Sequence, residues 1–246
     1  MLDRSDGRGI LLIAAAPAES RAVCAAFGQA APERDWTVID LAPGRAMVQS
    51  GVGKVNAAIC AAKCAEPARF RTVINLGVCG ALPAMNGKTA LGIGDVVLAD
   101  CSVYADEGIA TETGFTDIAA AGFPPGGKAD PDFPGCAIPT HPALLGMLID
   151  RLPDAMWHHV GPIATVSTCS GTDSLALSIA QRTEAIAEAM EGAAIAHALA
   201  RVHGGSIAFA ELRIVSNTTG DRARQTWDLN GALACLQRVV AALSAR

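Results

Sequence analysis

The chain has 246 residues, of which 51% are hydrophobic and 17% are charged. A chain of this length and composition can bury a large core, which excludes a disordered polymer and a small disulfide-stapled scaffold. The net charge is −5 and the 19 lysine and arginine residues are scattered, so we expect no nucleic-acid partner. Because no linker or charge run divides the sequence, we expect a single domain over residues 1–246.

The cysteines and the N-terminal segment indicate the compartment. The eight cysteines lie in apolar, alanine-rich stretches, which predicts reduced, buried thiols rather than disulfides. Four charged residues in positions 1–9 precede an apolar run of only about ten residues, too short for a membrane span and in the wrong order for a secretory signal. We therefore expect a cytoplasmic protein with no membrane partner.

Short runs rich in isoleucine and valine alternate with alanine-rich amphipathic stretches, the pattern of an α/β layer fold. In chain order, the predicted strands are 10–15, 37–41, 45–49, 72–76, 95–99, 160–167, 185–188 and 206–216. The predicted helices are 18–30, 54–66, 141–151, 174–182, 191–203 and 229–245. We expect the helix at 191 to end at Gly204 and the last helix to begin after Asp228 as its N-cap. Residues 101–140 form a proline- and glycine-rich segment, interpreted as a long loop that serves a site or an interface or is a solvated insertion.

Several familiar motifs fail on inspection. Gly87-Lys88-Thr89 lacks the glycine of a P-loop, since Leu82 stands five residues before it. The turn at 51–56 departs from a dinucleotide fingerprint at its last position and has no acidic residue about twenty residues on. Cysteine and histidine spacings match no zinc site. We therefore predict no cofactor and no metal.

Polar residues cluster where predicted strands end, which is where α/β proteins place ligands. Glu19 follows the first strand, Gly77 and Gly80 follow the fourth, and residues 216–221 (SNTTGD) follow the last. A carboxylate in the first turn of a helix often serves only the helix dipole, so none of these is decisive alone. Glu191 adds a carboxylate at the start of a helix of small residues, where burial is costly unless the group is paired.

These segments together resemble the nucleoside phosphorylase and hydrolase superfamily, especially its methylthioadenosine/S-adenosylhomocysteine nucleosidase branch. The resemblance runs from about residue 10 to the C-terminus. Within the branch, the futalosine hydrolases are most similar, on segments 104–108 (YADEG), 167–172 (STCSGT), 190–194 (MEGAA) and 216–228 (SNTTGDRARQTWD). The resemblance implies a three-layer sandwich with a central mixed β-sheet flanked by helices, and cleavage of the N-glycosidic bond of a small-molecule nucleoside.

The resemblance also implies roles for individual residues. Glu191 would accept both ribose hydroxyls, with Met190 packing on the sugar. Glu19 would orient or deprotonate the attacking water. Gly77 and Val78 belong to the glycine turn beside the substrate. Residues 167–171, among them Thr168 and Ser170, resemble the base-binding wall, where backbone groups read the purine edge.

Two departures refine this interpretation. Phosphorylases carry an arginine and a serine around the glycine turn, whereas this chain has Asn75 and Val78, which favours water over phosphate as nucleophile. Adenine-specific nucleosidases carry an aspartate where this chain has Asn217, and an amide can donate to the 6-oxygen or nitrogen 7 of a purine, which favours hypoxanthine as the leaving base. Asp221 becomes a candidate proton donor, or else it pairs with Arg222 or Arg224 to order its loop. Trp227 either stacks on substrate or belongs to the core.

Three alternatives remain open at this point. The chain could be a methylthioadenosine-type nucleosidase, an inosine-type hydrolase, or a nucleoside-binding sensor without turnover. Retention of both Glu19 and Glu191 argues against the sensor, because a binding protein needs no water-orienting carboxylate. The family also implies a homodimer or larger assembly in which the long loop of one subunit closes its neighbour's site, and residues 101–140 would supply that loop.

Overall fold

The computed structural model describes residues 7–85, 90–126 and 135–244. Its strands are β1 (Gly9–Ala14), β2 (Ile39–Ala42), β3 (Arg45–Gln49), β4 (Phe70–Ala81), β5 (Val96–Tyr104), β6 (Gly108–Thr111), β7 (Gly114–Asp117), β8 (Ala137–Pro139), β9 (His158–Thr165), β10 (Ala187–Ala189) and β11 (Ala208–Thr218). Its helices are α1 (Pro17–Ala25), α2 (Lys54–Cys64), α3 (Pro142–Arg151), α4 (Asp173–Thr183), α5 (Gly192–His203) and α6 (Leu229–Ser244). The expected strands and helices are therefore confirmed, with shifted ends.

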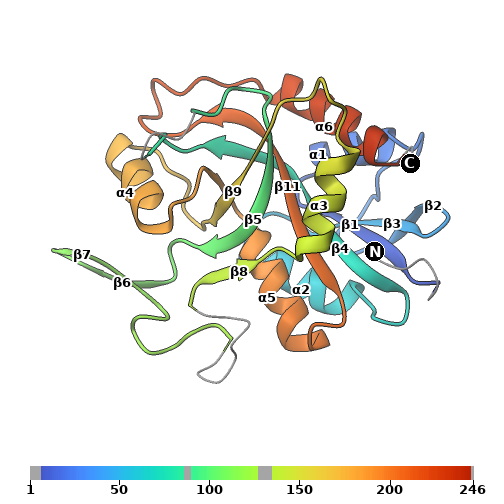
Figure 1. The fold of residues 1–246 in the computed structure, drawn as a ribbon, viewed down its shortest axis with the longest axis horizontal. Coiled ribbons are helices and arrows are strands. Elements are labelled where there is room, and N and C mark those ends of the chain that lie inside the picture. The colour runs from blue at the N-terminus through green and yellow to red at the C-terminus, as the bar shows by residue number, and fades with distance from the viewer. Residues whose placement is uncertain (1–6, 86–89, 127–134, 245–246) are drawn as a thin grey trace.

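A mixed sheet runs through the molecule in the order β10-β9-β5-β11-β4-β1-β3-β2 (Figure 1). Strands β3, β1, β4 and β11 are mutually parallel, whereas β5 runs antiparallel to β11. The short strand β10 pairs with β9 and also, antiparallel, with β4, so this end of the sheet curls back on itself. The predicted central mixed sheet is confirmed, and its partial closure is a feature that the sequence did not indicate.

Helices cover both faces of the sheet, as expected for three layers (Figure 1). Strand β1 illustrates why: successive side chains of a strand point to opposite faces. Leu12 belongs to the apolar cluster that includes α1, α3 and α6, whereas Leu11 and Ile13 belong to the cluster that includes α2 and α5. A strand buried on both faces must be apolar throughout, which accounts for the unbroken run that made β1 recognisable.

The segment 101–140 is not one long loop. Its first residues complete β5, β8 pairs antiparallel with β5, and β6 pairs with β7 as a separate two-stranded hairpin. Figure 1 shows this hairpin extending away from the body of the molecule. The expectation of an irregular segment was therefore wrong. The strands of this segment could not be predicted, because they are short and their residues alternate little in polarity. The rejected P-loop motif, Gly87-Lys88-Thr89, lies outside the described residues.

All eight cysteines are free thiols, as predicted. Five are buried, Cys101 and Cys136 are half-buried, and Cys169 is exposed, so the expectation of burial was wrong for Cys169. Across the residues that the structure covers, no helix has both the length and the apolarity needed to cross a bilayer.

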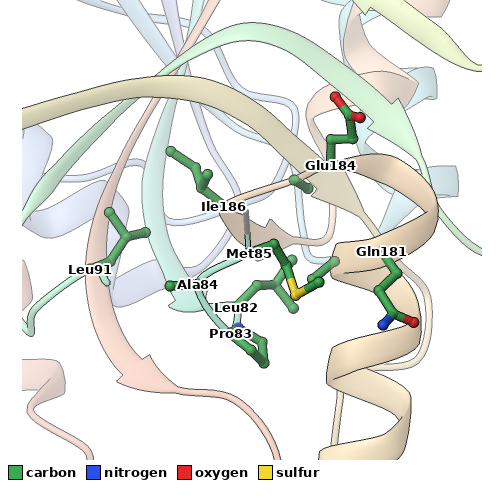
Figure 2. Close-up of a pocket in the computed structure, with 10 residues that line it drawn as sticks. Leu82, Pro83, Ala84, Met85, Leu91, Gln181, Glu184 and Ile186 are labelled. Carbon is green, nitrogen blue, oxygen red and sulfur yellow. The ribbon is translucent and has the colours of Figure 1, made fainter. Parts of the chain in front are cut away.

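Two hollows of the surface differ in size and in lining. The smaller, of about 190 Å³, lies between the chain that follows β4 and the end of α4, and is shown in Figure 2. Most of the residues that line it are apolar, among them Leu82, Met85 and Leu91, and the head groups of Gln181 and Glu184 turn away from Leu82 and Met85. The larger gathers the polar side chains described next.

Candidate active site

A cavity of about 530 Å³ brings together segments that are far apart in the sequence. It is lined by residues of the β1–α1 turn, the late part of β4, the β9–α4 loop, the β10–α5 turn, and β11 with the loop that follows it. The residues expected at the site that line it are Glu19, Val78, Ser170, Met190, Glu191 and Asn217. Gly77, Thr168 and Asp221 do not line it, and the geometry explains each case.

Glu19 is held by backbone N–H groups from two separate segments. The N–H groups of Ala15 and Ala16 donate to Oε2 at 3.2 and 2.8 Å, and that of Val78 donates to Oε1 at 2.8 Å. Glu19 stands in the first turn of α1, so it also serves as the helix cap that a first-turn carboxylate often provides. Burial raises the pKa of Glu19, and nearby Arg213 lowers it by less, so the net pKa lies above its ordinary value. A fixed carboxyl group with a raised pKa is suited to exchanging a proton with water.

Arg213 is the central cation of the site and is only 1% exposed. Its Nε donates to Glu211 Oε1 at 2.8 Å, and its Nη2 donates to Glu191 Oε2 at 3.1 Å. Burial lowers the pKa of this guanidinium, but the carboxylates of Glu211, Glu191 and Glu19 outweigh that effect and raise it. One arginine thus faces three buried carboxylates, which leaves the local charge negative.

Two glycines make this crowded arrangement possible. A Cβ on Gly77 would lie 2.4 Å from Glu19 Oε1 and 2.6 Å from Arg213 Nη1. A Cβ on Gly192 would lie 1.9 Å from Glu211 Oε2. The resemblance places Gly77 beside substrate, which stays a prediction; in the structure this glycine leaves room for two charged side chains. The neighbouring Val78 lines the cavity, and its N–H donates to Glu19.

Glu191 stands at the N-cap position of α5, immediately after Met190. The Gly53 N–H donates to Oε1 at 3.1 Å, and Arg213 donates to Oε2, so each carboxylate oxygen has one protein partner. A carboxylate has about four acceptor positions in total, so two remain. Glu191 is 3% exposed and lines the cavity, which places those acceptors toward a bound molecule.

Asn217 lies in a different part of the cavity. Ser216 Oγ donates to its Oδ1 at 2.9 Å, and its Nδ2 donates to the Thr218 carbonyl at 3.0 Å. The Thr218 carbonyl can only accept, so it fixes the NH₂ end of the amide toward it, and Nδ2 keeps a second N–H. Because Asn217 lines the cavity, this second N–H can serve a molecule bound there.

The wall formed by residues 167–171 differs from what was expected. The N–H groups of Ser167 and Thr168 donate to Asp106 Oδ2, at 2.5 and 3.2 Å, and that of Ser170 donates to Glu188 Oε1 at 2.9 Å. The Ser170 carbonyl accepts from Gln225 Nε2 at 3.0 Å. These backbone groups already have partners within the protein, whereas Cys169 and Gly171 line the cavity, so the reading of a purine edge by this wall stays a prediction.

Asp221 does not line the cavity and takes part in an ion pair. Arg224 Nε donates to its Oδ2 at 3.1 Å, and its own N–H donates to Asp173 Oδ1 at 2.8 Å. This is the ion-pair alternative that the sequence left open. Trp227, by contrast, lines the cavity and is 49% exposed, with the Arg222 guanidinium 4.7 Å from the ring centroid, so it is not a core residue.

Sequence reasoning missed three charged residues of the site: Arg213, Glu211 and Glu188. A usable signal existed for the first two, because positions 211 and 213 share one face of β11 and interrupt an otherwise apolar strand with opposite charges. Glu188 stands in a three-residue strand and gave no comparable pattern. Within residues 7–85, 90–126 and 135–244, no group of three or more histidine, cysteine, aspartate or glutamate side chains is arranged to hold a metal ion.

The sequence matches known proteins along most of its length. The model of the phosphorylase superfamily matches residues 30–245. A futalosine hydrolase of Acidothermus cellulolyticus is 34% identical over 239 residues, covering 96% of this chain and 90% of that protein. A futalosine hydrolase of Streptomyces coelicolor is 30% identical over 244 residues, covering 96% and 94%.

Solved structures share the fold at lower identity. A methylthioadenosine/S-adenosylhomocysteine nucleosidase of Colwellia psychrerythraea, in complex with adenine, gives a TM-score of 0.72 at 23% identity and covers 96% of this chain and 94% of its own. A futalosine hydrolase mutant of Helicobacter pylori gives 0.71 at 18% identity and covers 96% and 98%. Taken with the matches along the whole sequence, these findings show that the chain belongs to the phosphorylase superfamily and, within it, to the futalosine hydrolase family.

Proposed function

We propose that this protein is an N-glycosidase that hydrolyses futalosine to hypoxanthine and dehypoxanthine futalosine, a step of menaquinone biosynthesis. The observation that carries the proposal is the pair of buried carboxylates, Glu19 and Glu191, held around Arg213 in one cavity. The choice of futalosine as the substrate follows the relatives at 30–34% identity, which bear the name futalosine hydrolase.

Glu191 binds the ribose in this proposal. Its two remaining acceptor positions suit the two neighbouring hydroxyl groups of the sugar, and Met190 packs on the ring beside it. Loss of the base leaves positive charge on the ribosyl group in the transition state, and the negative surroundings of Arg213 stabilise that charge. The same interactions gain strength as the bond breaks, which is what catalysis requires.

Glu19 activates the water. Its carboxylate takes one proton as the water oxygen bonds to the anomeric carbon, and the bond between that carbon and the purine breaks with its electron pair going to the base. The base takes up a proton from solvent to leave as hypoxanthine, and Glu19 returns its proton to solvent, so the net change is addition of water. Asn217 donates its second N–H to the purine and stabilises the negative charge that develops there.

Water is the nucleophile rather than phosphate. Asn75, at one of the places where phosphorylases carry phosphate-binding groups, is buried with its Nδ2 3.4 Å from Glu211 Oε1, and Val78 offers no hydroxyl. Arg213, whose positive charge acts on Glu19, already has three carboxylates around it. A phosphate dianion placed there would meet net negative charge.

We further propose that the working protein is a homodimer or larger. The proposal rests on the family resemblance, on the projecting hairpin of β6 and β7 (Figure 1), and on the exposed apolar side chains Val55 and Ile59 of α2. Light scattering checks it, since an active species at 25.1 kDa would contradict it.

A cytoplasmic location is proposed on the free state of all eight cysteines, because free thiols persist in reducing compartments. Cell fractionation with an antibody against the protein tests this. Recovery mainly from an oxidising compartment would contradict it.

The experiment that tests the function is base release from futalosine, followed by ultraviolet absorbance and product chromatography, with and without phosphate. The expected products are hypoxanthine and the free sugar derivative at a rate independent of phosphate. A sugar 1-phosphate product would mean phosphorolysis, and release of adenine from methylthioadenosine with no action on futalosine would assign the other nucleosidase activity.

A further inference from the structure

Glu188 is a buried carboxylate in the cavity that the mechanism above does not use. It is the middle residue of β10, paired with Ala164 of β9 and with Gly80 of β4, so its backbone is fixed from both sides. The residue is 5% exposed, yet it lines the same cavity as Glu191 and Asn217. An ionised group in such a place needs partners to remain charged.

Ser170 supplies two of those partners. Its N–H donates to Glu188 Oε1 at 2.9 Å and its hydroxyl donates to Oε2 at 2.6 Å. Each carboxylate oxygen therefore keeps one acceptor position. Burial raises the pKa of Glu188, with the bonds from Ser170 lowering it by less, so its ionised form lacks solvation that a ligand N–H would supply.

Glu188 also lies next to Asn217. A Cβ built on Gly80 would lie 3.1 Å from Asn217 Nδ2 and 3.5 Å from Glu188 Cγ, so both side chains approach the same point of the cavity wall. The cavity thus presents a carboxylate acceptor and an amide donor side by side. The N–H groups of the neighbouring wall, those of Ser167, Thr168 and Ser170, are occupied by Asp106 and Glu188. Glu188 and Asn217 are therefore polar side chains that are placed to read an arriving base.

We propose that Glu188 determines the choice of base by accepting the N1–H of a 6-oxopurine while Asn217 donates to its 6-oxygen or nitrogen 7. Adenine has a bare acceptor at N1 and an amino group at position 6, so it would set an acceptor against the Glu188 carboxylate and a donor against the Asn217 N–H. A site of buried polar groups rejects a mispaired ligand strongly. This inference rests on the proposed function and adds the residue that reads the far edge of its leaving base.

The test compares binding of free hypoxanthine and free adenine, as competitive inhibitors or by calorimetry, in the unmodified protein, Glu188→Gln and Glu184→Gln. Glutamine can keep its carbonyl on the Ser170 N–H and donate its amide to the Ser170 hydroxyl, so the fold should survive. Loss of a charge-assisted bond should weaken hypoxanthine about tenfold to hundredfold. Adenine should bind no more weakly than before, because the new N–H can donate to its N1. Glu184 is an exposed glutamate four residues away, outside the cavity, and its variant should bind both bases as the unmodified protein does.

A purely structural role predicts a different pattern. If Glu188 only anchors Ser170, its replacement should weaken both bases by the same factor, and that result would overturn the proposal, as would an unchanged preference. A measurement without any variant guards against misfolding: 1-methylhypoxanthine lacks the N1–H and should bind the unmodified protein at least roughly tenfold more weakly than hypoxanthine. Equal binding would reject the role of Glu188. Turnover separates the two proposals, since a protein that cleaves futalosine but shows none of these effects refutes this inference alone.

Discussion

Replacing Glu191 with glutamine should nearly abolish turnover while leaving the protein folded. In the structure its two carboxylate oxygens each accept one N–H, from Gly53 at 3.1 Å and from Arg213 Nη2 at 3.1 Å. A glutamine can satisfy only one of these donors, because its other end carries an NH₂ group. Arg213 retains Glu211 at 2.8 Å, so the guanidinium does not lose its charge partner.

The magnitude follows from the contacts that are lost. A hydrogen bond to a charged group contributes about 1.5–3 kcal/mol, and the amide of the Glu191→Gln variant would replace an acceptor for a ribose hydroxyl with a donor. One such loss lowers kcat/KM roughly 10- to 150-fold, and the reduced negative charge near the ribosyl group lowers it further. In the Glu191→Gln variant the NH₂ end of the glutamine would face the N–H of Gly53 or of Arg213, and this pairing of two donors should lower the free energy of unfolding by about 1–3 kcal/mol. Weaker repulsion among the carboxylates would offset part of this loss.

Base release from futalosine, followed by ultraviolet absorbance, measures the loss, and thermal unfolding checks the fold. Glu66→Gln is a matched control, since Glu66 is an exposed residue just after α2 and does not line the cavity. The control should keep full activity. An active Glu191→Gln protein, with kcat/KM within about threefold of the unmodified one, would refute the assignment of Glu191 to the ribose.

Four further outcomes are expected. Gly77→Ala would place a Cβ 2.4 Å from Glu19 Oε1, so activity should be lost and the free energy of unfolding should fall by about 1–3 kcal/mol. An active variant that is as stable as the unmodified protein would contradict this packing. As pH falls, kcat/KM should drop with an apparent pKa above 4.5, because burial raises the pKa of Glu19 and only its ionised form can accept the proton of the water. The contribution of Glu19 to folding stability should change in the opposite sense: it is present at acid pH and is lost as pH rises through the raised pKa. Asp221→Asn should change kcat by less than about threefold, since its carboxylate pairs with Arg224 outside the cavity, and a large drop in kcat at unchanged stability would restore it as a proton donor. Asn217→Asp should raise activity on adenine nucleosides relative to futalosine, and an unchanged ratio measured on both substrates would count against the amide as a base-reading group.

Much of the fold could be predicted because its main strands are buried on both faces and are apolar without interruption. The end of β4 could not, since Gly77 and Gly80 look like the start of a turn, yet the strand continues to Ala81. The structure shows why glycine stands within a strand there: side chains from other segments occupy the space of each missing Cβ. Strand β10 could be predicted only approximately, because three residues carry too little pattern. Its pairing with β4 could not be predicted, because it depends on the arrangement of the whole sheet.

The site divides along the same line. Glu19, Glu191 and Asn217 could be selected because each is a polar residue at the end of a predicted element, and all three do line one cavity. Asp221 had the same local appearance, but its neighbour Arg224 and the distant Asp173 hold it outside. Arg213 and Glu188 belong to the site because of their contacts with Glu191 and Ser170 respectively. These contacts join residues that are far apart in the sequence, so they could not be predicted from neighbouring residues.

The central claim is that this cavity hydrolyses a hypoxanthine nucleoside, and the most direct test is the rate of base release by the unmodified protein from futalosine and from methylthioadenosine under the same conditions. We predict that futalosine yields hypoxanthine and that methylthioadenosine is nearly inert, with a discrimination of about 10⁴ or more from mispaired buried polar groups. Cleavage of methylthioadenosine as fast as futalosine would contradict the claim.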